Sequence, residues 1–291
     1  MIDLLEPVIG PFRDFAFMRR ALVACFALSL SCGPVGVFLI LRRMSLIGDA
    51  MSHAVLPGAA IGFLIGGLAL GPMSLGGFLA GLAVALLSGA VTRATALSED
   101  ASFAAFYPIS LAAGVLLVSL HGSNVDLMHV LFGTVLAIDD GALLLVSAIA
   151  TVTLIALALA WRPLVVESFD PAFLRAVGGG GALYHYLFLV LVVLNLVAGF
   201  QALGTLMAVG LMTLPAAAAR FWALETWSMS LVAIAIAFAA GLVGLLLSFH
   251  LDLPSGPSIV LVAGAIYLVS VALGRRHSLS ARFLPRRHLA H

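Results

Sequence analysis

The dominant features of this 291-residue sequence are its long apolar runs. Windows of about 20 apolar residues, the length at which a helix crosses the hydrocarbon core of a bilayer, recur along the whole chain. They predict spans at 21–41, 50–67, 75–92, 103–120, 139–160, 183–200, 204–221, 228–248 and 255–273. Several windows are short or interrupted by glycine or proline, so eight or nine transmembrane helices are expected. Because no window alternates like a barrel strand, the predicted fold class is all-α, one polytopic membrane domain over residues 1–291.

The composition supports a membrane protein and excludes two other classes. The chain is 63% hydrophobic and 9% charged, whereas a soluble domain carries about 25% charged residues. With a net charge of +1 and no basic patch before the C-terminal tail, nucleic-acid binding is not expected. All 14 basic residues are arginine. A Walker A phosphate loop requires a lysine, so this chain is not a P-loop ATPase.

The arginines orient the predicted spans. One side of the arrangement carries Arg42, Arg43, Arg93, Arg162, Arg175, Arg220, Arg275, Arg276, Arg282, Arg286 and Arg287, and the other carries Arg13, Arg19 and Arg20. By the positive-inside rule the first side is cytoplasmic. A basic cytoplasmic tail at about 274–291 is then expected to lie against anionic lipid headgroups. The N-terminal segment is expected outside or as an interfacial helix. It lacks the basic region of a cleaved signal peptide, so the first apolar run should remain in the mature protein.

The stretch GDAMSHAVLPG, residues 48–58, places ionisable side chains inside a predicted span. Asp49 and His53 are four residues apart and therefore share one face of a helix. Ionisable residues within a span are costly and are mostly functional. A carboxylate and an imidazole on one face predict a metal-ion site, and the charge of the ion would offset the cost of an ionised Asp49. The alternative interpretation is an Asp–His hydrogen bond that only orders the helices.

Two other patterns in the early spans predict packing rather than chemistry. Gly58, Gly62 and Gly66 recur at four-residue spacing, which allows a neighbouring helix to approach closely. Cys25 and Cys32 share a helix face but are too far apart along the axis to form a disulfide, so they are expected to pack as small apolar side chains.

The longest polar loop on the arginine-rich side, residues 161–181, contains a complete short helix. Asp170 is a suitable N-cap, Pro171 suits the first helical position, and Gly178 can end the helix in a left-handed conformation. The exposed side chains would be Phe169, Phe173 and Arg175. A helix of about two turns is not stable alone. It is therefore either a connector resting on the membrane or a docking helix for a cytoplasmic subunit.

Several segments together resemble the membrane permease subunits of bacterial zinc and manganese ABC importers. The segments are residues 18–66, LSED at 97–100, LFG at 131–133, SFDPAFLRAVG at 168–178, GTLMAVGLMTLPAAAAR at 204–220 and GLLLSFHLDLPSGPSIVL at 244–261. They follow the order of the family over nearly the whole chain. One departure is His250, where related proteins often carry an aromatic residue.

The resemblance implies a type II ABC importer-like permease in the bacterial cytoplasmic membrane. Its expected partners are a second permease copy or a paralogue, a cytoplasmic dimer of ATPase subunits, and an extracytoplasmic metal-binding protein. Asp49 and His53 match residues that contact metal in that family, and 168–178 matches its coupling helix, with Phe169, Asp170, Phe173 and Arg175 facing the ATPase. The chain is then not an enzyme and needs no cofactor beyond the transported zinc or manganese ion.

Three other classes of protein are alternatives to this interpretation. An intramembrane hydrolase would need a catalytic set such as H-E-x-x-H, which is absent. A secondary cation transporter or channel working without ATP would suit an intramembrane Asp49, and inverted repeats would favour it. A permease for metal chelates would need no direct metal ligands. Carboxylate and imidazole suit both ions, so zinc and manganese remain equal candidates.

The other histidines allow two interpretations each. His121 and His129, with Asp126 between them, form either an outer entry funnel for the ion or an ordinary polar loop. His185 is expected to be an interfacial residue at the cytoplasmic end of a span. His277, His288 and His291 belong to the basic tail.

Overall fold

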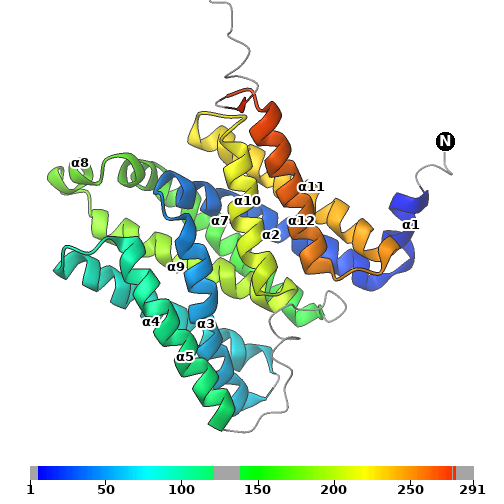
Figure 1. Cartoon of the computed structure of the whole chain (residues 1–291), viewed down its shortest axis with the longest axis horizontal. Coiled ribbons are helices and arrows are strands. Elements are labelled where there is room, and N and C mark those ends of the chain that lie inside the picture. Colours follow the sequence, from blue (N-terminus) through cyan, green and yellow to red (C-terminus); the bar gives the residue numbers. More distant parts are fainter. Residues whose placement is uncertain (1–5, 68, 121–137, 277, 280–291) are drawn as a thin grey trace, which may run out of the picture.

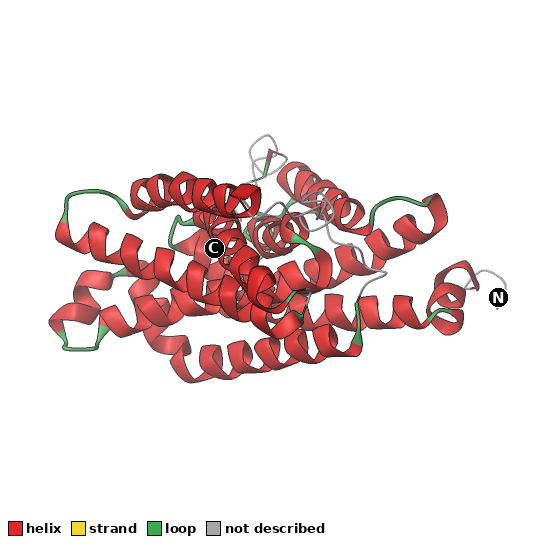
Figure 2. Cartoon of the chain, turned by 90° about the horizontal axis from the view of Figure 1, so that it is seen from below, coloured by secondary structure: helices red, strands yellow, loops and turns green. Residues whose placement is uncertain are grey.

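The computed structural model describes residues 6–67, 69–120, 138–276 and 278–279. Within these residues the chain is helical, with short loops and no strand (Figure 2). The helices are α1 Glu6–Asp14, α2 Ala16–Leu41, α3 Ser45–Gly66, α4 Leu70–Ala94, α5 Glu99–Leu120, α7 Asp140–Phe169, α8 Pro171–Ala176, α9 Gly181–Leu203, α10 Thr205–Ala219, α11 Thr226–Leu251 and α12 Ser255–Leu273. The all-α prediction is confirmed.

Each of the nine predicted spans corresponds to a helix, but they are not equivalent. Eight helices in the described part are long and apolar enough to cross a membrane, whereas α10 has 15 residues. A helix of that length is about 22 Å long, shorter than the hydrocarbon core of about 30 Å. Met207, Leu211 and Met212 of α10 are buried in the bundle, and Gly204, with φ 94°, makes the turn from α9. Among the described residues, the nine predicted spans therefore correspond to eight helices of spanning length and the shorter helix α10.

The helices form a centre with two flanks. In α2 and α9, 78% and 72% of the membrane window is buried, compared with 17% in α5. Figure 1 shows α3, α4 and α5 on one side of the molecule and α11 and α12 on the other. Cys25 and Cys32 are buried free thiols in the central α2, as the packing interpretation predicts. The exposed faces of α4 and α5 leave that flank open to lipid or to another chain.

The glycine ladder of α3 packs directly on α4. A Cβ atom added at Gly58 would overlap the carbonyl oxygen of Gly76, and one at Gly62 would overlap the carbonyl oxygen of Pro72. At Gly66 the added atom would lie 2.5 Å from Cγ of Pro72. The backbones of α3 and α4 therefore touch without intervening side chains, which confirms the predicted packing face.

One predicted boundary is wrong. The apolar window ends at residue 160, but α7 continues without a break to Phe169. Polar residues such as Arg162 and Glu167 end the hydropathy signal, but they do not interrupt the helical hydrogen bonds. The helix therefore extends beyond its apolar part. The non-helical part of the predicted 161–181 loop is accordingly short.

At the other end of the chain, residues 6–14 form the separate helix α1, which matches the interfacial-helix alternative. Val8 and Ile9 are exposed on α1. The backbone carbonyl of Pro7 lies 2.9 Å from His250 Nε2, and Phe15 packs on Phe249 with ring centroids 5.3 Å apart. His250, the departure from the family pattern, therefore ties α1 to the end of α11.

Candidate functional site

Asp49 and His53 lie one turn apart near the start of α3, as predicted. His53 Nε2 is 3.9 Å from Asp49 Oδ1. This distance is too long for a hydrogen bond, so the structure does not contain the Asp–His hydrogen bond of the alternative interpretation. The Asp49 side chain is 67% exposed and that of His53 is 31% exposed. Both side chains lie on the same face of α3 and are partly exposed, and they do not form a hydrogen bond with each other.

Helix α5 holds the imidazole in place. The ring of Tyr107 packs against His53 with centroids 5.2 Å apart, and Ser110 Oγ donates to the carbonyl oxygen of Ala54 at 3.3 Å. A Cβ atom added at Gly114 would lie 3.1 Å from Pro57, so α5 also approaches α3 closely at this level. His53 Nδ1 is buried and has no hydrogen-bond partner among the described residues. The sequence analysis did not identify Tyr107, because its role depends on a contact between two helices.

The pair supplies an incomplete set of metal ligands. Transition-metal ions in proteins bind four to six ligands, with imidazole and carboxylate among the common ones. In the described part of the chain, no group of three or more His, Cys, Asp or Glu side chains could hold a metal ion. An ion at Asp49 and His53 would need further ligands from water, from another chain, or from both.

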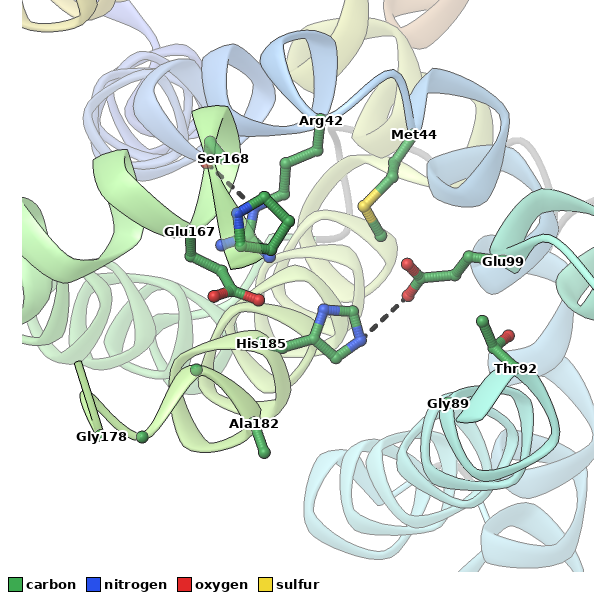
Figure 3. A pocket seen from close by; sticks show the side chains of 13 residues that line it. Arg42, Met44, Gly89, Thr92, Glu99, Glu167, Ser168, Gly178, Ala182 and His185 are labelled. Atoms are coloured by element: carbon green, nitrogen blue, oxygen red, sulfur yellow. Dashed lines mark hydrogen bonds and ion pairs between the residues drawn. The ribbon is translucent and has the colours of Figure 1, made fainter. Parts of the chain in front are cut away.

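A second polar site lies at the end of the bundle that the arginine distribution predicts to be cytoplasmic. A cavity of about 890 Å³ is enclosed by the ends of several helices and by the α8 segment (Figure 3). It is lined by Arg42, Met44, Gly89, Thr92, Glu99, Glu167, Ser168, Pro171, Gly178, Gly180, Gly181, Ala182 and His185. The start of α3, which carries the Asp49–His53 pair, is thus close to the predicted coupling segment.

A contact between a carboxylate and an imidazole crosses this cavity. His185 Nε2 of α9 lies 3.0 Å from Glu99 Oε1 of α5, and the two side chains are only 14% and 23% exposed. Figure 3 shows both side chains pointing into the same space. His185 lies near the start of α9, at the end of a span as expected, and its contact with Glu99 is an additional feature that the sequence analysis did not identify. Local sequence patterns could not reveal this pair, because its members belong to helices far apart in the chain.

Arg42 connects the end of α2 to the end of α7. Its Nε donates to Ser168 Oγ at 3.1 Å, and its guanidinium carbon lies 4.4 Å from the centroid of the Phe188 ring. Burial lowers the pKa of Arg42 to about 10, and the Glu167 and Glu99 carboxylates oppose this shift. The guanidinium is therefore cationic at neutral pH. Its Nη2 is buried without a hydrogen-bond partner in the described structure.

The short helix α8 has the capping predicted from the sequence. Asp170 Oδ1 accepts a hydrogen bond from the backbone N–H of Phe173 at 2.9 Å, and Gly178 adopts φ 71° just after the helix. Phe169 and Phe173 are 66% and 57% exposed. α8 lies at one edge of the molecule, away from the bundle centre (Figure 1). The side chain of Arg175 lies outside the described part, so its predicted exposure stays a prediction.

Other predicted features also lie outside the described residues. These are His121, Asp126, His129 and the LFG segment at 131–133, together with His277, His288 and His291 of the tail.

Comparisons with known proteins agree with the resemblance read from the sequence. The family model of the ABC 3 transport family matches residues 14–274. The manganese import system permease protein ScaB of Streptococcus parasanguinis is 33% identical over 283 residues, covering 96% of this chain and 100% of that protein. A probable iron transport system membrane protein of Haemophilus influenzae is 29% identical over 272 residues, covering 94% and 97%.

The fold is also similar to that of a solved structure. The solved structure of PsaBC from Streptococcus pneumoniae in complex with Fab has a TM-score of 0.83 to this chain, with 31% identity over 97% of this chain and 100% of that chain. The family match covers all eight helices of spanning length. The protein is a multi-pass membrane protein that belongs to the ABC 3 transport family.

Proposed function

We propose that this chain is the permease subunit of an ABC importer in the bacterial cytoplasmic membrane, and that it moves a divalent transition-metal ion inward. The observation that carries this proposal is the open Asp49–His53 pair, with the unpartnered Nδ1 of His53 and the exposed Asp49 carboxylate on one face of α3. Carboxylate and imidazole together select a bare cation rather than a bulky organic chelate.

Manganese is the first candidate ion. ScaB is named for manganese import, and the Haemophilus influenzae relative is named for iron. Zinc uses the same two ligand types and stays in the proposal as the second candidate. Because these ions share ligands, the preference has to be measured by competition.

The ligand set is completed by a second permease, either another copy of this chain or a paralogue. Two Asp49–His53 pairs meeting across a two-fold axis would supply four ligands, enough for a tetrahedral site or for an octahedral site with two waters. The flank of α3, α4 and α5 carries the pair and includes the most exposed spanning helix, α5, so it offers a surface for such a contact. An extracytoplasmic metal-binding protein delivers the ion to this dimer.

Energy enters through α8, which docks onto a cytoplasmic ATPase subunit with Phe169 and Phe173. The Asp170 cap fixes the helix, and Arg175 adds a charge to the contact. Arg42 then transmits the movement of α8 to α3. It donates a hydrogen bond to Ser168, two residues before Asp170, and it lies seven residues before Asp49. Arg42 is a positioning residue in this scheme, and it touches neither the ion nor ATP. In this scheme the ATPase subunit hydrolyses ATP, and the permease needs no catalytic residue of its own.

The test uses the permease with its ATPase subunit and its extracytoplasmic metal-binding protein in proteoliposomes, with manganese uptake measured with and without ATP. Wild-type protein should take up manganese only with ATP, and the variants Asp49→Asn and His53→Gln should lose uptake while retaining ATPase association. Asp252→Asn is the matched control, because Asp252 is an exposed carboxylate at the end of α11, and an asparagine tolerates its φ of 52°.

Uptake driven by a proton or sodium gradient without ATP would replace this proposal with a secondary transporter. Unchanged uptake of manganese, iron and zinc by both site variants would remove Asp49 and His53 from the transport path.

A further inference from the structure

An apolar groove opens on the flank opposite the Asp49–His53 pair. It has a volume of about 420 Å³ and lies between α11, α12 and the loop after α10. Its lining consists of Trp222, Val232, Ile236, Val262, Ala265, Ile266, Val269 and Ser270. From Val269 to Val262 it follows α12 for about 10 Å at 1.5 Å per residue, the length of the upper part of a lipid acyl chain. Val269 is 53% exposed, so the groove faces outward from the bundle.

The cytoplasmic end of the groove is marked by a fixed indole. Trp222 Nε1 donates to Ser270 Oγ at 2.9 Å, so the polar edge of the ring is held at the mouth while its apolar face lines the groove. Next to Trp222 in the chain, Phe221 makes an edge-to-face contact with Tyr267, with centroids 6.3 Å apart. Tryptophan and tyrosine are typical of the level of the lipid headgroups.

Three arginines lie at the same end of the groove as Trp222. Arg220 caps α10 directly before Phe221, and Arg275 and Arg276 follow α12. The backbone N–H of Arg276 donates to the carbonyl oxygen of Phe221 at 3.0 Å, which brings the two segments together. All three side chains are exposed, and none has a carboxylate partner among the residues that the structure describes. The nearby Glu225 bonds the indole of Trp227 instead.

We propose that this region is a binding site for an anionic phospholipid of the inner leaflet. Arg220, Arg275 and Arg276 hold the phosphate, and one acyl chain lies in the groove below Trp222. Guanidinium groups form charge-assisted hydrogen bonds with phosphate oxygens, and basic pockets between helices on the cytoplasmic side select anionic headgroups. A zwitterionic lipid would fill the groove equally well but would gain less from three cations. The site is separate from the proposed ion path, because α11 and α12 lie across the molecule from α3 and α5 (Figure 1).

The test is native mass spectrometry of the full-length chain in detergent, titrated with phosphatidylglycerol, cardiolipin or phosphatidylcholine. The anionic lipids should bind at least about tenfold more tightly than phosphatidylcholine. The triple variant Arg220→Gln/Arg275→Gln/Arg276→Gln should bind all three lipids alike. Ala265→Phe, which fills the groove and leaves the arginines in place, should lose the tight binding as well. Arg162→Gln is the matched control, an exposed arginine at the cytoplasmic part of α7, and should bind as wild type does.

A second measurement does not depend on the arginine variants. In a protein with Trp161→Phe and Trp227→Phe, the fluorescence of Trp222 should be quenched more strongly by brominated phosphatidylglycerol than by brominated phosphatidylcholine at equal mole fraction. Equal quenching by the two lipids, equal binding of all lipids to wild type, or a triple variant that still prefers anionic lipid would each overturn the headgroup assignment. Tight anionic binding by Ala265→Phe would overturn the placement of the acyl chain.

Discussion

Asp49 and Arg42 are seven residues apart, yet the sites around them are built in opposite ways. The Asp49–His53 pair is open, its two groups do not bond each other, and the described residues supply no third ligand. Around Arg42, by contrast, a hydrogen bond to Ser168, a ring contact with Phe188 and the Glu99–His185 pair join the ends of four helices. A site left incomplete is suited to a transient ligand, whereas a buried network fixes helices relative to one another.

The largest expected effect is the loss of the buried cation. Arg42→Met should lower the free energy of unfolding by about 3 kcal/mol, because it removes the guanidinium that donates to Ser168, packs on Phe188 and lies near the Glu167 and Glu99 carboxylates. Thermal unfolding of the purified chain would show this as a lower midpoint. The double variant Arg42→Met/Glu167→Gln should recover part of the loss. A single variant as stable as wild type would mean that the cavity is not a structural network.

The next effect concerns docking rather than stability. Phe173→Ala should weaken ATPase binding by about 2–4 kcal/mol, the range of a well-packed aromatic anchor, while the unfolding midpoint stays unchanged because Phe173 is 57% exposed. Co-purification with the ATPase subunit measures the binding, and metal uptake measures the transport that depends on it. Exposed Leu183, on α9 and outside α8, serves as the control through Leu183→Ala. Normal assembly and uptake by Phe173→Ala would make α8 a mere connector.

A smaller loss of stability is expected when the Glu99–His185 contact across the cavity is removed. Glu99→Gln and His185→Asn should each destabilise the protein by about 1–2 kcal/mol. The double variant should lose less than the sum of the two single variants, because both remove the same contact. Thermal unfolding of the wild type and the three variants gives the double-mutant cycle that measures this interaction. Additive losses would show that the 3.0 Å contact contributes no interaction energy.

The Asp49 variant is expected to have the smallest effect on stability and the largest effect on transport. Asp49→Ala should change the free energy of unfolding by less than about 0.5 kcal/mol, because its side chain is 67% exposed and His53 is too distant to hydrogen-bond it. Uptake should nevertheless be lost. A marked drop in the unfolding midpoint would instead make Asp49 part of the structural framework and remove the contrast with Arg42.

Features encoded by neighbouring residues were predictable from the sequence. The Asp170 cap, the Pro171 start and the left-handed Gly178 follow from local backbone chemistry, and all three are present. The i, i+4 spacing of Asp49 and His53 likewise fixed their common face. Their role in metal transport stays a prediction, because geometry alone does not test it.

Features that depend on distant helices were missed. The Glu99–His185 contact arises only when the start of α5 comes close to the start of α9, and the Tyr107–His53 contact only when α5 packs against α3. A single sequence contains no local record of such contacts. The end of α7 was misplaced for a different reason. Hydropathy reports where a helix leaves the apolar layer, whereas the helix itself ends where its hydrogen bonds end, at Phe169.

At Gly58 and Gly62 the backbone of α3 contacts the backbone of α4 directly, so the two helices cannot slide or rotate past each other there without a clash. The pair must therefore be displaced as one rigid body. At its far end this body carries Gly89 and Thr92, which form part of the wall of the cytoplasmic cavity. A push on that wall from the ATPase side would tilt α4, and α3 would tilt with it. Asp49 and His53 would then swing relative to any partner across the dimer axis, so the ion could be released by separating the two halves of its ligand set.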